Sequence, residues 1–500
     1  MNNFTAFRRS KILLSVLAGV GAMAGVAVAQ QVCPVLPIPV FPVAPGMGSL
    51  VGVPVPLPQQ LDTVIKNRPA AIALGKAFFW DKQAGSDGQA CASCHFHAGA
   101  DNRSKNQLTP GMRAVPPDTV FHPTRTGAGG PNYQLKAGDF PFHVLADPLD
   151  RNSTVLFHTN DATSSQGTFG GDFLQFVGQG NESCALDTSN IFQVGGKLTR
   201  KVPARNTPTT INSIFQFRSF WDGRANNHFN GVNPFGRRDP NARILVRQTD
   251  GSVLPEVLDL ENAALASQAV GPLLNDTEVS CSKRTFELVA RKLFTLIPTP
   301  LFQQKVERDD SVLGPYANLT GTGLKAGVTY PSMIQAAFHD KYWLAPGFVS
   351  ADGYTLMEEN FSMFWGLAIM MYESTLVSDN TPFDGFVGVV TPGRPITSNP
   401  LAPQLFELTN TIVQPNFGAL SQQQVNGMML FAGKGKCLAC HKGPDFTGAG
   451  INLQFTQTVN QESVIERMVM GDKGVAIYDN GFYNIGVTPT SNDLGVGGSD

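Results

Sequence analysis

Two segments of the chain have the spacing Cys-x-x-Cys-His. They are Cys91-Ala-Ser-Cys94-His95 and Cys437-Leu-Ala-Cys440-His441. Two thiols separated by two residues can bond to both vinyl groups of one porphyrin, and the imidazole of the next residue then reaches the iron as its proximal ligand. The sequence therefore predicts two covalently bound haem c groups, with His95 and His441 as axial ligands of the two irons.

Zinc is the main alternative for paired cysteines beside a histidine. A structural zinc site needs four ligands, usually from two such pairs at a defined spacing. The chain has no second Cys or His pair at that spacing, and two complete copies of the motif argue against a chance match. Haem attachment is therefore the favoured interpretation of both motifs.

The motifs leave the opposite face of each iron undetermined. A second ligand there would give an electron carrier, whereas an open face would admit a substrate. His97 is too close to His95 to reach the far side of the same haem. The other histidines suit ordinary loop or packing positions, and His158 is the first of them to watch as a ligand; they are His122, His143, His158, His228 and His339.

Residues 1–29 have the form of a cleaved secretory signal. Basic Arg8, Arg9 and Lys11 precede an apolar run that ends in the small-residue pattern Ala27-Val28-Ala29. The run is rich in Gly and Ala and barely reaches membrane-spanning length, so we expect cleavage and no membrane anchor. The mature protein is then expected in the periplasm.

Three cysteines lie outside the two motifs, namely Cys33, Cys184 and Cys281. In an oxidising compartment Cys184 and Cys281 can form a disulfide, although the sequence alone does not fix the pairing. Cys33 would then be the odd one, and because no small-residue lipidation box directly precedes it, we expect no lipid anchor.

The composition limits the class of partner and sets a scale for the fold. The chain has 37 Lys and Arg against 39 Asp and Glu, without a long run of either sign. It therefore lacks the basic surface that nucleic acid requires.

With 500 residues the chain exceeds the size at which a single hydrophobic core stops growing, so two or more domains are expected.

The first half of the chain changes character several times. Residues 30–60 are rich in proline, which predicts an extended linker. Apolar positions from Leu61 to Trp80 predict one or two short helices before the first motif. Between His97 and Arg205 the chain is rich in Gly, Asn, Asp and Thr without a helical period, which predicts a loop-dominated insertion with a few short strands.

The strongest helical pattern lies in the second half, from Tyr354 to Val377, and is apolar almost all round. This segment is expected to be a buried helix. A further helix is predicted directly before Cys437, while residues 442–500 are rich in Gly, Asn and Asp and look unfinished.

Further blocks accompany the two motifs in a definite order. They are Leu74–Asp81, Asp87–His95, Arg205–Pro208, Phe220–Ala225, Gln268–Pro272 with Glu278, Tyr372–Ser378, Pro382–Asp384, and Cys437–His441 with Gly443-Pro444. In these blocks, over about residues 61–500, the chain resembles the bacterial dihaem cytochrome c peroxidases, which include MauG-type enzymes, and in particular the long members with large insertions.

The resemblance implies different roles for the two haems. In that family the first haem is peroxidatic, the second is a high-potential site that receives electrons, and a Trp between them lies on the transfer route; by resemblance this is Trp221. A Glu and a Gln manage the protons as the O–O bond breaks, and the matching residues are Glu278 and Gln268. General acid–base work of this kind is worth typically about 10²–10⁴-fold in rate.

The resemblance also implies a calcium ion between the two domains. Asn206 matches one of its ligands, and an amide oxygen suits this hard cation. The partner ligands are expected beyond residue 500.

Two departures from the family pattern matter for the two irons. Members that are activated by reduction carry a removable His ligand shortly before Arg205, but residues 195–204 contain none. Either the first haem is open without activation, or a His from the insertion replaces that ligand. The family's chain also continues past the second haem into the segment with its distal Met, whereas this sequence ends at Asp500 and looks truncated. Met468 or Met470 could serve as the distal ligand of the second haem instead, although a Met that simply packs in a helix or loop is the commoner case.

We therefore expect a mainly α fold with two cytochrome c-like haem domains and loop-rich insertions. The expected parts are a signal peptide at 1–29, a linker at 30–60, an N-terminal peroxidatic domain at 61–385 with insertions at about 98–200 and 226–266, and an incomplete C-terminal domain at 386–500 that receives electrons.

The expected activity is the reduction of hydrogen peroxide to water with electrons from a small periplasmic cytochrome c or cupredoxin. One alternative is a MauG-like, peroxide-dependent oxidase of a protein or organic substrate, with Tyr at the second haem. The other is a non-catalytic dihaem electron-transfer cytochrome. The oligomeric state is open, with a homodimer as one option.

Overall fold

The computed structural model divides into two compact units, Met1–Pro42 and Val43–Asp500. The residues that the structure describes all belong to the second unit; they are 47–113, 116–150, 152–387, 419–451, 458–459, 462–463, 465–470, 473–479, 481–486, 490–493 and 495. The predicted signal segment 1–29 lies outside them, as does the first part of the predicted linker. The rest of that linker, residues 48–60, has neither helix nor strand.

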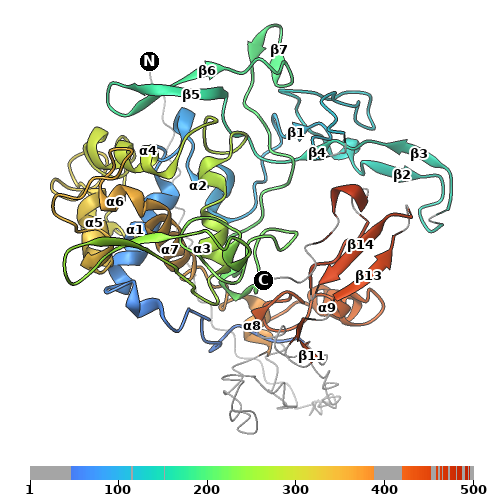
Figure 1. Ribbon diagram of the computed structural model, residues 1–500. Helices are drawn as coiled ribbons and strands as arrows, with labels where there is room; N and C mark the ends of the chain where they lie inside the picture. Colours follow the sequence, from blue (N-terminus) through green and yellow to red (C-terminus); the bar gives the residue numbers. More distant parts are fainter. Residues whose placement is uncertain are drawn as a thin grey trace, which may run out of the picture. The chain divides into compact units, whose positions relative to one another are not determined.

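The helices belong mostly to the part of the chain before residue 388. They are α1 (Arg68–Trp80), α2 (Cys91–Cys94), α3 (Ala264–Ala269), α4 (Phe286–Arg291), α5 (Tyr330–Ala337), α6 (Leu356–Glu359), α7 (Phe361–Glu373), α8 (Pro382–Val387) and α9 (Gln422–Ala432) (Figure 1). Within the described ranges, none of them is long and apolar enough to cross a membrane.

The strands form separate two-stranded antiparallel pairs in the described residues. The pairs are β1 (Leu108–Thr109) with β4 (Ala162–Thr163), β2 (His143–Leu145) with β3 (Val155–His158), β5 (Gly170–Val177) with β6 (Asn181–Leu186), β7 (Gln193–Val194) with β8 (Lys197–Leu198), β9 (Ile244–Arg247) with β10 (Val253–Glu256), β11 (Thr458–Val459) with β12 (Glu462–Ser463), and β13 (Ile465–Val469) with β14 (Val475–Asp479).

The prediction of a mainly α fold is wrong. Helix makes up 28% of the chain and strand 15%, and no cytochrome c-like domain is visible in the residues that the structure describes. The segment between residues 98 and 200 forms β1 to β8, because its Gly, Asn, Asp and Thr residues favour turns and compete with helical hydrogen bonding. The attachment motifs add little helix, since α2 has four residues and Cys437–Ala439 is a single 3₁₀ turn.

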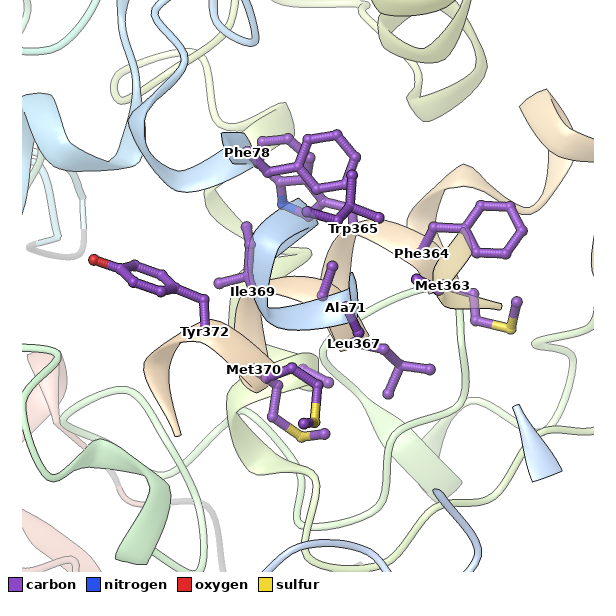
Figure 2. Packing of buried hydrophobic residues seen from close by; sticks show 14 of the residues in the cluster. Ala71, Phe78, Met363, Phe364, Trp365, Leu367, Ile369, Met370 and Tyr372 are labelled. Atoms are coloured by element: carbon purple, nitrogen blue, oxygen red, sulfur yellow. The ribbon is translucent and has the colours of Figure 1, made fainter. Parts of the chain in front are cut away.

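The hydrophobic core is built around α7. All thirteen of its residues are buried, as the apolar pattern predicted, and the helix packs against α1 and α3. Figure 2 shows Phe78 of α1 against Trp365 of α7; their ring centroids are 4.8 Å apart, and Phe78 also stacks on Tyr330 at 4.9 Å. The indole nitrogen of Trp365 donates to the carbonyl of Ala269 in α3.

The predicted helix over 354–377 is interrupted at Asn360, between α6 and α7. The Asn360 side chain accepts a hydrogen bond from the Leu245 amide at 2.9 Å and donates to the carbonyls of Leu245 and Tyr342. Asn competes with the backbone in this way wherever its side chain finds backbone partners. The break ties the α6–α7 corner to β9, in the insertion at 226–266.

Helix α1 confirms the helical pattern expected before the first motif. It begins at Arg68, where the side chain of Asn67 accepts a hydrogen bond from the Ala70 amide, a favourable N-cap. Its buried side includes Leu74, Phe78 and Phe79. The helix ends at Trp80, eleven residues before the first attachment cysteine, so its core packing fixes where that motif starts.

Beyond residue 380 the core is smaller. Phe386 of α8 and Met428 of α9 are buried there together with Met47. Helix α9, which confirms the helix predicted before Cys437, starts with the reciprocal hydrogen bonds of a capping box between Ser421 and Gln424. The second attachment motif therefore rests on a small apolar cluster rather than on the main core.

Cys184 and Cys281 form the disulfide that the sequence allowed. The bond joins β6 to the segment after Glu278 across a sequence separation of 97 residues. In the chain-entropy account, closing a loop of about 100 residues stabilises the folded state by about 4–5 kcal/mol. It fastens the insertion to the segment that carries Glu278.

The close crossing of α1 and α7 gives a test of the core. A Cβ at Gly75 would overlap the carbonyl oxygen of Ala368, so we expect Gly75→Ala to lower the free energy of unfolding by about 1–3 kcal/mol. Gly427→Ala in α9 is the matched control, because a Cβ there meets nothing within 4 Å and gains up to about 1 kcal/mol of helix propensity. Chemical denaturation of both variants measures the difference, and a Gly75→Ala protein as stable as the parent would contradict the crossing.

Candidate functional site

The first attachment motif is placed by a pairing with a distant segment. The Ser86 amide donates to the Val279 carbonyl at 2.8 Å, and the Cys281 amide donates to the Ser86 hydroxyl at 2.9 Å. Gly85 allows this approach, because a Cβ there would lie 2.8 Å from the Val279 side chain. The turn before Cys91 is thereby held against the residues that directly follow Glu278.

The His95 imidazole is oriented for a metal bond. Its Nδ1 lies 2.9 Å from the carbonyl oxygen of Pro208, and since a carbonyl only accepts, Nδ1 carries the proton and Nε2 keeps its lone pair. Burial lowers the pKa of His95, which favours the neutral ring that binds iron. Pro208 belongs to the Arg205–Pro208 block, so this block fixes the ring through its backbone.

The cysteines of the first motif fit haem better than zinc. Cys91 and Cys94 are free thiols in half-buried positions. Burial raises the pKa of both thiols, that of Cys94 to about 12, and among the described residues no third His, Cys or carboxylate ligand atom groups with both of them at metal-binding distance. Two thiols beside a histidine with a free Nε2 match the donor set that covalent haem attachment uses.

Glu278 lies beside this motif. Its carboxylate is close enough to Cys91 and Cys94 to raise the pKa of both thiols. Burial in turn raises the pKa of Glu278 to about 7, with Arg224 acting in the opposite direction and Asp276 adding to the rise. A carboxyl that titrates near neutral pH can both accept and donate a proton, as general acid–base catalysis requires.

Gln268 is less well connected to the site. It lies half-buried on α3, and its carbonyl accepts a hydrogen bond from the Gly271 amide at 3.0 Å. Within the described residues, no hydrogen bond joins its side chain to Glu278 or His95. The electrostatic effect on the Cys91 and Cys94 thiols places Glu278 beside the first motif, whereas the position of the Gln268 amide relative to it stays a prediction.

Trp221 lies on an exposed turn of the central block. Its side chain is 47% exposed, and the Arg205 guanidinium lies 4.4 Å from the ring centroid. Asp222 holds this arrangement, because it binds Arg205 at 2.6 Å and Arg224 at 2.9 Å. Arg224 also lies over the ring of Phe220, 3.8 Å from its centroid. Trp221 is therefore in the same turn of the chain as Arg224, the arginine that interacts electrostatically with Glu278.

The second motif repeats the orientation of the first in a more open setting. Nδ1 of His441 lies 3.1 Å from the carbonyl oxygen of Phe446, which again leaves Nε2 for a metal. His441, Cys437 and Cys440 are exposed. The donor set therefore fits a second covalent haem as well.

The central block also touches the segment that follows the second motif. The Phe217 amide donates to the Ala449 carbonyl at 2.8 Å, and Gln216 forms an isolated antiparallel bridge with Gly450. Residues 216–224 thus contact the segment that follows His441 directly. They are connected to the first motif through the electrostatic interaction between Arg224 and Glu278.

The remaining predicted ligands are not gathered at a site. Asn206 is exposed, and its amide donates to the Thr163 carbonyl at 3.3 Å; within the described residues no group of three metal ligands includes a residue near it. Met468 is on β13, and whether it or Met470 binds the second iron stays a prediction. His158 is on β3 and pairs with His143 rather than with the first motif.

Sequence reasoning missed a second buried acid next to Cys91. Glu373, the last residue of α7, is 6% exposed, and burial raises its pKa to about 8. Its charge contributes to the raised pKa of the Cys91 thiol. The sequence signal for this residue was its place in the Tyr372–Ser378 block. A carboxylate at the end of an otherwise apolar helix is unusual, since ionised side chains are seldom buried without a partner.

The chain was also compared with known proteins. Residues 178–389 match the family described as Di-haem cytochrome c peroxidase, and this match supports the assignment of the chain to that family. The matched range contains Trp221, Gln268 and Glu278 but neither attachment motif. No curated protein matches the chain. The family indicates a haem c cofactor and a peroxidase-like or MauG-like oxidoreductase.

The number of haems follows from the two motifs and can be counted. We expect two covalent haems per chain, one in a Cys91→Ala, Cys94→Ala variant, and one in a Cys437→Ala, Cys440→Ala variant. The Cys33→Ala variant removes a cysteine outside the motifs and the disulfide, and is expected to keep both haems. Mass spectrometry of the denatured proteins gives the counts, and an unchanged count after loss of either motif would contradict the assignment.

Proposed function

We propose that the protein reduces hydrogen peroxide at the His95 site with electrons that enter at the His441 site. The reaction consumes one peroxide, two electrons and two protons, and releases two waters. When bound, the haem at Cys91–His95 supplies the redox centre at which the O–O bond breaks. The observation that carries the proposal is Glu278, a carboxyl with a pKa of about 7 beside the attachment cysteines of that site.

Glu278 is proposed to manage the protons. In its ionised form it accepts a proton from one peroxide oxygen, and it then returns the proton to the other oxygen, which leaves as water. Arg224 opposes the rise in the Glu278 pKa and so keeps a useful fraction ionised near neutral pH. Gln268 is proposed as a second polar group that orients the peroxide, in keeping with the family pattern.

Trp221 is proposed to lie on the electron route. Its block contacts Ala449 on one side, and Arg224 of the same block influences Glu278 on the other. The Arg205 guanidinium over the indole disfavours removal of an electron from the ring, because the resulting positive charge would face another. This charge argues against storage of an oxidised Trp, and it therefore favours the peroxidase over a MauG-like oxidase.

The physiological setting completes the proposal. The electron donor is a small cytochrome c or cupredoxin in the periplasm, reached through the signal at residues 1–29. A calcium ion at Asn206 and pairing of two copies of the chain are proposed on the family pattern alone.

Glu278→Gln tests the proton role. Because glutamine cannot take up the proton, we expect kcat/KM for peroxide to fall by about 10²–10⁴-fold with both haems retained. Glu261→Gln, at an exposed position of the insertion, is the control and should keep full activity. In the parent protein kcat/KM should rise with pH through about 7 as Glu278 ionises, and this step should vanish in Glu278→Gln. Parent-like turnover of the variant would overturn the proposal.

Trp221→Phe tests the electron route. We expect a slower passage of electrons from the His441 site to the His95 site after one equivalent of peroxide is mixed with the reduced protein, because the indole no longer bridges the two. Trp343→Phe is the matched control, since its indole nitrogen bonds to the Phe338 carbonyl away from the central block. Rapid-mixing absorbance gives the rates, and equal rates for the two variants would exclude the route.

A further inference from the structure

Two histidines face each other on the hairpin formed by β2 and β3. His143 and His158 are opposite residues in the strand register, and both are exposed. Their Nδ1 atoms are 3.3 Å apart, and the ring planes are inclined at 80°. The proposed peroxidase reaction uses neither residue, and their hairpin belongs to the insertion predicted at about 98–200.

The distance between the two nitrogens suits a shared metal as well as a hydrogen bond. At 3.3 Å one ring can donate a long hydrogen bond to the other, at the edge of the usual range of about 2.7–3.2 Å. Two nitrogens bound to one tetrahedral zinc at about 2.0–2.1 Å are separated by about 3.3–3.4 Å. Adjacent ligands in a square-planar copper site would be closer, at about 2.8–3.0 Å. The spacing therefore suits a tetrahedral ion better than a square-planar one.

The surroundings of the pair also suit a cation. His122 also lies close enough to His158 to interact with it electrostatically, and an imidazole binds a metal through a ring nitrogen that carries no proton. Asp118 binds His122 at 2.5 Å. Asp161 accepts from the His122 amide and keeps its buried Oδ2 without a hydrogen-bond partner. Two carboxylates thus lie beside His122.

We propose that His143 and His158 bind one zinc ion through their Nδ1 atoms. Among the described residues, no third His, Cys or carboxylate ligand atom groups with this pair, so water fills the other positions of the tetrahedron. The ion would join β2 to β3 across the hairpin, independently of the two haem sites.

The test uses the full-length protein with its haems and Zn²⁺ as the probe. Equilibrium dialysis against zinc chloride, followed by metal analysis, is expected to show one zinc per chain in the parent protein. His143→Ala and His158→Ala should each weaken binding at least tenfold, whereas His339→Ala should not, because its Nε2 is engaged with the Asp62 carbonyl. The exposed positions of both hairpin residues let the variants fold, which the haem spectrum checks.

X-ray absorption at the zinc edge then identifies the ligands. Four nearest neighbours with the outer-shell scattering of two imidazoles would support the site. Zinc that binds equally well to the His143→Ala, His158→Ala double variant, or a six-coordinate shell of oxygen alone, would overturn it as adventitious surface binding.

Discussion

A buried carboxylate fixes the geometry of the first attachment site. Glu182 of β6 accepts hydrogen bonds from Lys292 at 2.6 Å and from Ser86 at 2.5 Å, and Arg284 lies 3.4 Å away. The Glu182, Lys292 and Arg284 side chains are at most 3% exposed. Removal of one partner from such a cluster costs about 3–5 kcal/mol, because a charge is left buried and unpaired. The Cys184–Cys281 disulfide closes the same junction, so the turn before the motif and the residues after Glu278 stay in register.

The two motifs share local chemistry but differ in their surroundings. His95 and His441 both direct Nδ1 to a backbone carbonyl, which leaves the same nitrogen for a metal. Around His95 the chain places Glu278 and Glu373, two carboxyls whose pKa values burial raises to about 7 and about 8. His441 is exposed and rests on a small apolar cluster. Buried carboxyls with raised pKa values therefore gather at the first site, whereas the second site is exposed.

The sequence predicted the features that depend on local pattern. Spacing of residues within short segments was enough for these features. They are the buried helix α7, the helices before both motifs and the motifs themselves. The mainly α fold was wrong, because turn-forming residues between 98 and 200 make hairpins that only distant partners can cover. The approach of Glu278 to the first motif was implied by resemblance alone, since it depends on a pairing between residues about 190 apart in the chain. Glu373 and the His143–His158 pair were missed as sites, because a buried acid and a cross-strand contact become visible only with the neighbouring element in place.

The central claim is that one of two covalent haems is open to peroxide while the other is closed. The most direct measurement is the electron paramagnetic resonance spectrum of the purified ferric protein before and after addition of cyanide, which binds only an iron with an accessible sixth position. We predict a high-spin signal from one haem that cyanide converts to low spin, and a second, low-spin signal that cyanide leaves unchanged. Two low-spin signals that are both insensitive to cyanide, in the ferric protein and after partial reduction, would contradict the account and indicate a carrier of electrons.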